Sequence, residues 1–106
     1  MFKKFELVRE IKNKTDEVIS RCNLLKGEIY DREALDIVKT VSDTLRINSL
    51  ATLDCCAQMI NEINQGVLRS DCEEKLQMEV YSLDYLESML DIAEIREMHR
   101  KFNSNK

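Results

Sequence analysis

The chain contains no proline and only two glycines, Gly27 and Gly66, among its 106 residues. A β-rich protein of this size needs a tight turn every ten or so positions, and glycine and proline build most of those turns. Because these residues are nearly absent, a fold made of strands and short turns is excluded. The sequence predicts an all-α protein, and its length predicts a single helical-bundle domain over residues 1–106.

In the first quarter of the chain, apolar residues recur every three or four positions, as they do along one face of a helix. Gly27 follows the basic residue Lys26, a common arrangement just beyond the end of a helix. We therefore predict a first helix over residues 3–26. The residues expected on its buried face are Phe5, Val8, Ile11, Thr15, Val18, Cys22 and Leu25.

A second helix is predicted over residues 31–65, with Asp31 as its N-cap and Gly66 directly after its end. Its buried face begins with Ala34, Val38, Val41 and Leu45. Asn48 and Thr52 take the next positions of this face, so we expect burial to shift to a second apolar line. That line comprises Leu50, Leu53, Ala57 and Ile60. A break near Asn48, giving four helices, is the alternative, but no glycine or proline enforces one.

A third helix is predicted over residues 71–102, because Ser70 and Glu73 have the spacing of a capping box. Short connections make sequential helices antiparallel, so the first and third helices should run in the same direction. The expected fold is an antiparallel bundle of three long helices with coiled-coil packing.

The charges of the first and third helices support this arrangement. Residues 1–26 include seven basic and four acidic side chains, whereas residues 70–94 include one basic and eight acidic side chains. Helices that run side by side in the same direction would bring these opposite charges together. The residues expected to meet are Lys3, Lys4 and Arg9 from the first helix and Asp71, Glu73 and Glu74 from the third.

The third predicted helix has apolar residues on two opposite sides. One side holds Leu76, Val80, Leu83 and Leu90, with Phe102 continuing the line. The other side holds Met78, Tyr81, Tyr85, Met89 and Ile92. An outer helix of a three-helix monomer needs only one apolar face. The second face therefore belongs either to an intramolecular four-helix bundle or to an interface with another molecule.

Tyrosine and methionine are typical of protein interfaces, because they bury a large area and adapt their contacts. We therefore predict a small non-catalytic interaction module: an adaptor, a regulator, an inhibitor or a chaperone of a partner protein. It is expected to form a homodimer, or to bind a protein partner, through the third helix. The predicted interface residues are Met78, Tyr81, Tyr85, Met89 and Ile92.

The residue types that carry chemistry do not form a recognisable catalytic or metal-binding pattern. Cys55 and Cys56 are adjacent, and the other two cysteines, Cys22 and Cys72, lie on different predicted helices. Zinc sites use closely spaced pairs of ligands, so we interpret these cysteines as small packing residues. With His99 as the only histidine, we predict no enzyme activity, no metal, no cofactor and no small-molecule substrate.

Nucleic-acid binding is the alternative function, because Lys3, Lys4, Lys12 and Lys14 give the first helix a basic start. The overall charge of −4 disfavours this alternative. The chain lacks an uninterrupted apolar run of about 18 residues, so no membrane span is expected. Four cysteines without a secretory signal are typical of a reducing compartment, and the expected location is cytoplasmic.

Overall fold

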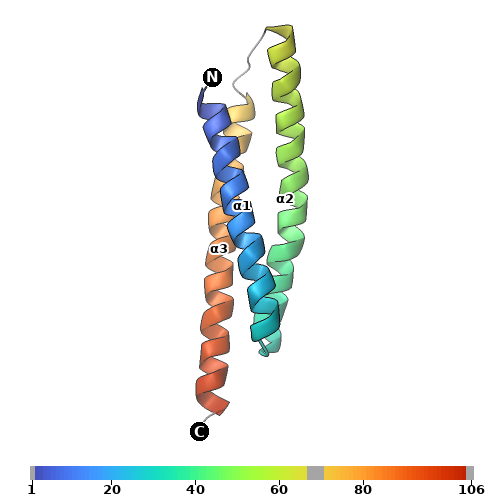
Figure 1. Ribbon diagram of the computed structural model, residues 1–106. Helices are drawn as coiled ribbons and strands as arrows, with labels where there is room; N and C mark the ends of the chain where they lie inside the picture. Colours follow the sequence, from blue (N-terminus) through green and yellow to red (C-terminus); the bar gives the residue numbers. More distant parts are fainter. Residues whose placement is uncertain (1, 67–70, 105–106) are drawn as a thin grey trace.

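The computed structural model describes residues 2–66 and 71–104, which form three long helices. They are α1 (Phe2–Glu28), α2 (Arg32–Gln65) and α3 (Asp71–Ser104). Together they build a rod of 66 × 17 × 17 Å (Figure 1). The prediction of an all-α bundle of three long helices is confirmed, and α2 continues through Asn48 without a break.

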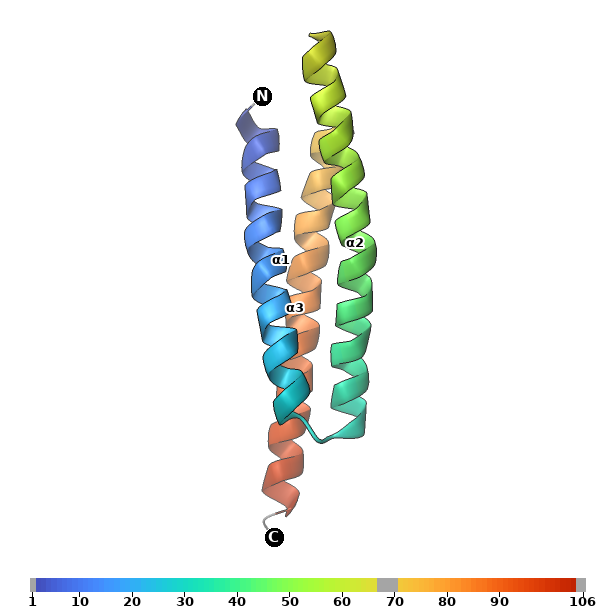
Figure 2. The same ribbon diagram turned by 45° about the vertical axis from the view of Figure 1, so that its right-hand side comes forward.

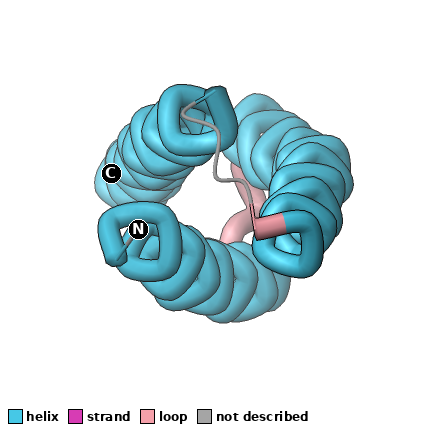
Figure 3. The backbone as a smooth tube through the Cα atoms, turned by 90° about the horizontal axis from the view of Figure 1, so that it is seen from above, coloured by secondary structure: helices cyan, strands magenta, loops and turns pink. Residues whose placement is uncertain are grey.

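The three helices lie around a common axis, along which α1 and α3 run in one direction and α2 in the other (Figure 2). Seen from the end, each helix follows a curved path around this axis (Figure 3). The ends are staggered: α2 extends past the other two helices at the upper end, and α3 extends past them at the lower end (Figure 1). Each end of the rod therefore presents a single helix.

The helix ends test the predicted caps. The Oδ1 atom of Asp31 accepts a hydrogen bond from the backbone N–H of Ala34 at 2.8 Å, as an N-cap should. Gly66 has a φ of 71°, which confirms the predicted glycine at the end of α2. The prediction for Gly27 is wrong, because α1 includes this residue and ends at Glu28. The predicted capping role of Ser70 lies outside the described residues.

A single apolar core runs between the three helices. On α3 the fully buried residues Leu76, Leu83 and Leu90 are spaced by seven positions, the repeat of a coiled coil. The structure corrects the expected core at one end of α1 and at one end of α3. Leu7 is buried near the start of α1, whereas Phe5 is 46% exposed, and Phe102 of α3 is 63% exposed.

The buried face of α2 does not shift as predicted. Its original line continues at alternating spacings of three and four through Asn48, Thr52, Cys55 and Met59, which are all buried or half-buried. Leu50, Leu53 and Ile60, which the sequence placed in the core, are more than 60% exposed. The heptad register of α2 therefore continues unchanged, and it places polar residues inside the bundle.

Hydrogen bonds to Glu97 connect the elements at the lower end of the bundle. Glu97, a buried residue seven positions after Leu90, accepts hydrogen bonds from the backbone N–H groups of Tyr30 and Asp31 at 3.1 and 2.8 Å. Arg100 donates to the same carboxylate at 2.8 Å and lies 5.6 Å from the centre of the Tyr30 ring. The hydrogen bond from Arg100, followed by those from the two backbone amides, lowers the pKa of Glu97 to about 2. The carboxylate thus ties α3 to the connection between α1 and α2.

Candidate interaction surface

The face of α3 that points away from the core carries a second regular line of residues, which we name the outer stripe. Its positions alternate at spacings of three and four, the same spacing as the inner line. The outer stripe comprises Met78, Tyr81, Tyr85, Ser88, Ile92, Ile95, His99 and Phe102. These positions span about 36 Å of helix at 1.5 Å per residue.

The large side chains of the outer stripe lie mostly in solvent. Met78, Tyr81, Tyr85, Ile92, Ile95 and Phe102 are each between 52% and 67% exposed. Four of the predicted interface residues belong to this set. The fifth, Met89, lies beside the stripe, where it is half-buried and packs against the protein's own core. Sequence reasoning missed Ile95 and His99, although both continue the spacing of Ile92.

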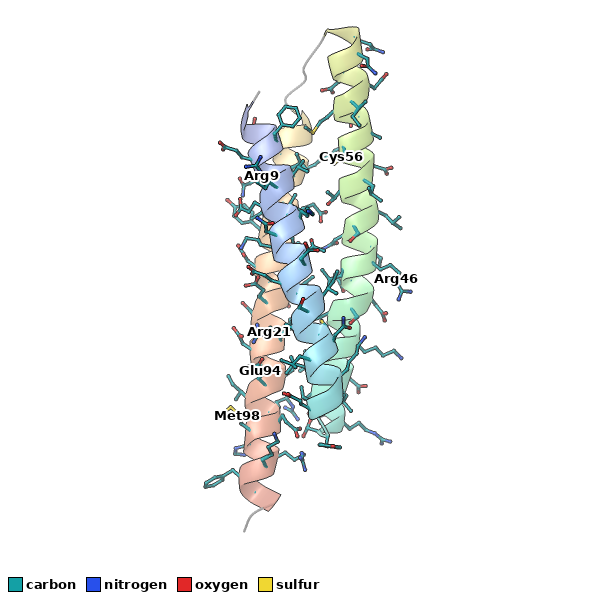
Figure 4. The ribbon with its side chains drawn as sticks, in the orientation of Figure 1. Arg9, Arg21, Arg46, Cys56, Glu94 and Met98 are labelled. Atoms are coloured by element: carbon teal, nitrogen blue, oxygen red, sulfur yellow. The ribbon has the colours of Figure 1, made fainter. Side chains whose placement is uncertain are left out.

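Ion pairs border the outer stripe on both sides. On the side of α1, Lys14 contacts Asp84 at 2.6 Å, and Arg21 binds Asp91 and Glu94. Figure 4 shows Arg21 and Glu94 at the junction of α1 and α3. On the side of α2, Arg96 pairs with Glu33. The surface is thus an apolar band between rows of charges that are already paired, similar to the polar rim of a protein interface.

Between α1 and α3, the described residues form ion pairs of Lys14 with Asp84 and of Arg21 with Asp91 and Glu94. The predicted attraction of Lys3, Lys4 and Arg9 to Asp71, Glu73 and Glu74 stays a prediction. The side chains of Lys3, Lys4 and Asp71 lie outside the described part of the chain. Of the four lysines proposed for nucleic-acid contact, Lys14 is engaged with Asp84 and Lys12 is exposed at the edge of a groove.

That groove lies between α1 and α2, above a floor formed by α3, and has a volume of about 350 Å³. Apolar side chains from all three helices line it: Val8, Ile11, Leu45, Leu53 and Leu83. The polar seam residues Thr15, Asn48 and Thr52 gather at the same place. Asn48 donates a hydrogen bond to Ser82 at 2.8 Å, and Thr52 donates to the Asn48 carbonyl oxygen at 3.1 Å.

Glu79 of α3 also lines the groove and was not singled out by the sequence reasoning. Its Oε2 atom is buried and has no hydrogen-bond partner among the described residues. Burial raises the pKa of this carboxyl group. The heptad position of Glu79, three residues after the core residue Leu76, is the signal that could have identified it.

Cys22, Cys55 and His99 lie on three different helices, and the side chain of Cys72 lies outside the described residues. Cys22 and Cys55 are buried in the core of α1 and α2, respectively. Cys22 lies near Leu45, about 15 Å along α2 from Cys55 at 1.5 Å per residue. Among the side chains that the structure describes, no three from His, Cys, Asp and Glu converge into a metal-binding group. His99 belongs to the exposed outer stripe.

In residues 2–66 and 71–104, no helix has a segment long and apolar enough to cross a membrane. Comparisons of the chain with models of protein families, with curated proteins and with solved structures find no match.

Proposed function

We propose that this protein is a small non-catalytic interaction module that associates with a second copy of itself through the outer stripe of α3. One observation carries the proposal: large apolar side chains occupy the outer stripe at coiled-coil spacing while facing solvent. Contiguous apolar patches of this kind mark interaction surfaces in monomeric folds.

The amount of exposed apolar surface suits a dimer. Six large side chains, each more than half exposed, offer on the order of 600 Å² per copy. A standard protein–protein interface buries about 800 Å² per partner. The flanking residue Met89 and the aliphatic parts of the bordering side chains supply the remaining area.

An antiparallel pairing of two α3 helices places Ser88, the one small residue of the outer stripe, opposite a large residue. In the register that overlaps the whole stripe, Tyr85 packs against Ile95 of the second copy and Ile92 against Ser88. Met78 meets Phe102, a favourable contact of sulfur with an aromatic ring. Met89 then lies beside the two-fold axis, next to its own counterpart. The two Asp91 carboxylates also approach each other, but Arg21 of the same chain already pairs with each.

A parallel pairing in register would instead place each residue opposite itself. Ser88 would face Ser88 and leave a gap in the middle of the seam, because neither side chain fills the layer. Antiparallel helices also align their dipoles favourably. We therefore propose the antiparallel homodimer.

The first test combines two substitutions in the stripe, Tyr85→Ala and Ile92→Ala. We expect the wild-type chain to elute at twice its 12.4 kDa mass in light-scattering chromatography and the double variant to elute as a monomer. The matched control is Ile47→Ala with Leu24→Ala, which removes apolar side chains that are 68% and 61% exposed outside α3. The control should still dimerise, and dimerisation that survives in the stripe variant would refute the assignment.

Cysteine cross-linking tests the orientation. In the antiparallel dimer, a mixture of Ser88→Cys and Ile92→Cys chains should form a disulfide between positions 88 and 92, identified by peptide mapping. Ser88→Cys alone should give little cross-linking between two copies of position 88. The reverse pattern would show a parallel dimer.

A further inference from the structure

The groove between α1 and α2 lies on the side of the bundle opposite the outer stripe, so a dimer formed through α3 would leave it open. It is built from α1 residues Val8, Ile11 and Thr15 and from the α2 stretch 45–53, with Leu83 and Glu79 from α3. Its walls are largely apolar. This combination of an apolar lining and a few polar groups is typical of a ligand site.

Among the described residues that line the groove, Glu79 is the one with an unsatisfied hydrogen-bond acceptor. Its Oε2 atom is buried and has no hydrogen-bond partner among the described residues. Buried polar atoms in proteins normally have such a partner. Because Glu79 lines the groove, a hydrogen-bond donor brought into it would meet the carboxyl group, and a rotation of that group would bring Oε2 to the donor. A positively charged donor would satisfy this atom best, because it would also compensate for the burial of the carboxylate.

The size of the groove decides between a small molecule and a helix. A volume of about 350 Å³ lies within the range of small-molecule sites. A helix with its side chains is about 10–12 Å wide and could only rest across the opening. The groove is therefore suited to a compact ligand that enters it.

We infer that the groove binds a small amphiphilic cation, with its ammonium group at Glu79 and its apolar part along Val8, Ile11, Leu45, Leu53 and Leu83. Lys12 and Asp16 at the rim are both exposed and of opposite charge, so together they neither repel nor attract the ligand strongly. Glu79 then sets the preference for a cation. The inference is independent of self-association, since it uses a different face.

The test is a titration of the ¹⁵N-labelled protein at pH 7 with n-octylammonium, n-octanol and n-octanoate, each below its micelle concentration. We expect n-octylammonium to shift the amide signals of Val8, Thr15, Asn48 and Thr52 and to bind at least tenfold more tightly than n-octanoate. Glu79→Gln should reduce this preference to less than threefold. The matched control Glu74→Gln removes an exposed carboxylate from the same helix and should leave the preference unchanged.

Three results would overturn the inference. The first is equal affinity for the ammonium and the carboxylate ligand. The second is shifts confined to the outer stripe, which would show nonspecific adsorption to its apolar side chains. The third is an unchanged cation preference in a folded Glu79→Gln variant, with folding checked by circular dichroism.

Discussion

The two faces of α3 have the same spacing of large apolar residues but opposite surroundings. On the inner face, Leu76, Leu83 and Leu90 are almost completely buried against α1 and α2. On the outer face, Tyr85 and Ile92 are 67% and 52% exposed. Heptad spacing therefore identifies a packing surface without saying whether the chain itself supplies the partner. The inner face has its partner within the molecule, and the proposed function assigns the outer face a partner in a second copy.

The largest expected effect comes from the inner face. Leu90→Ala removes a fully buried side chain and leaves a cavity between three helices. We expect the free energy of unfolding to fall by about 3 kcal/mol. Urea denaturation followed by circular dichroism measures this change. A loss below about 1 kcal/mol would mean that the core relaxes around the gap and that the inner face contributes little.

Ile92→Ala, two positions further along the same helix, should act on association instead. We expect the dimer dissociation constant to rise at least tenfold, because truncating an interface anchor costs about 2 kcal/mol. Stability measured at a concentration where the protein is monomeric should change by no more than about 0.5 kcal/mol. Sedimentation velocity and denaturation of the same variant separate the two quantities. Ile47→Ala, an exposed isoleucine on α2, is the control and should change neither.

The dependence of stability on pH tests the role of Glu97, which lies at the polar end of the inner face. Its folded pKa of about 2 lies below its ordinary value, so its contribution to stability is complete above about pH 5 and is lost as the pH falls toward 2. We expect Glu97→Gln to lower the melting temperature at pH 7 and to flatten the dependence of the melting temperature on pH between 5 and 2. Glu74→Gln is the control with an exposed carboxylate. A pH profile identical to that of the wild type would contradict the role of Glu97.

The smallest effect is expected at the border of the outer stripe. Lys14 and Asp84 are 2.6 Å apart, but the side chain of Asp84 is 51% exposed. Exposed ion pairs typically contribute less than about 1 kcal/mol. Lys14→Gln should therefore lower the free energy of unfolding by less than that amount, and 1 M salt should remove most of the difference. A larger loss that persists in salt would show that Lys14 acts through packing.

The helices were predictable because strong local signals mark them. Asp31 and Gly66 have few other roles available in such a sequence, and both occupy the predicted cap positions. The prediction that Gly27 follows the helix was wrong, because a glycine can also lie inside a helix that tertiary contacts stabilise. Here the backbone N–H of the core residue Ile29 still donates a hydrogen bond to the carbonyl oxygen of Leu25 at 2.9 Å.

The outer stripe was only partly predictable, for a geometric reason. An ideal straight helix turns by about 100° per residue and drifts by about 20° per heptad relative to a coiled-coil seam. Over the 26 residues from Leu76 to Phe102, this drift adds up to about 75°, which in a straight-helix projection moves Phe102 from the outer face toward the flank of the inner line. Phe102 was therefore assigned to the core line, and Ile95 and His99 were missed.

The groove was not predictable, because its floor depends on how three helices meet. Thr15, Asn48 and Thr52 could be recognised as polar residues in apolar seams, but nothing in the sequence places them next to one another. Glu79 joins them only in the folded bundle. Asn48 and Thr52 suggested a shift in the buried face of α2, whereas the structure accommodates both residues beside the groove.

Sedimentation equilibrium of the unmodified chain between 1 and 200 µM tests the role of the outer face most directly. We predict a reversible shift of the average mass from one chain toward two, with no species beyond the dimer. A constant mass of 12.4 kDa across this range would contradict self-association and leave the exposed stripe of α3 without the partner assigned to it.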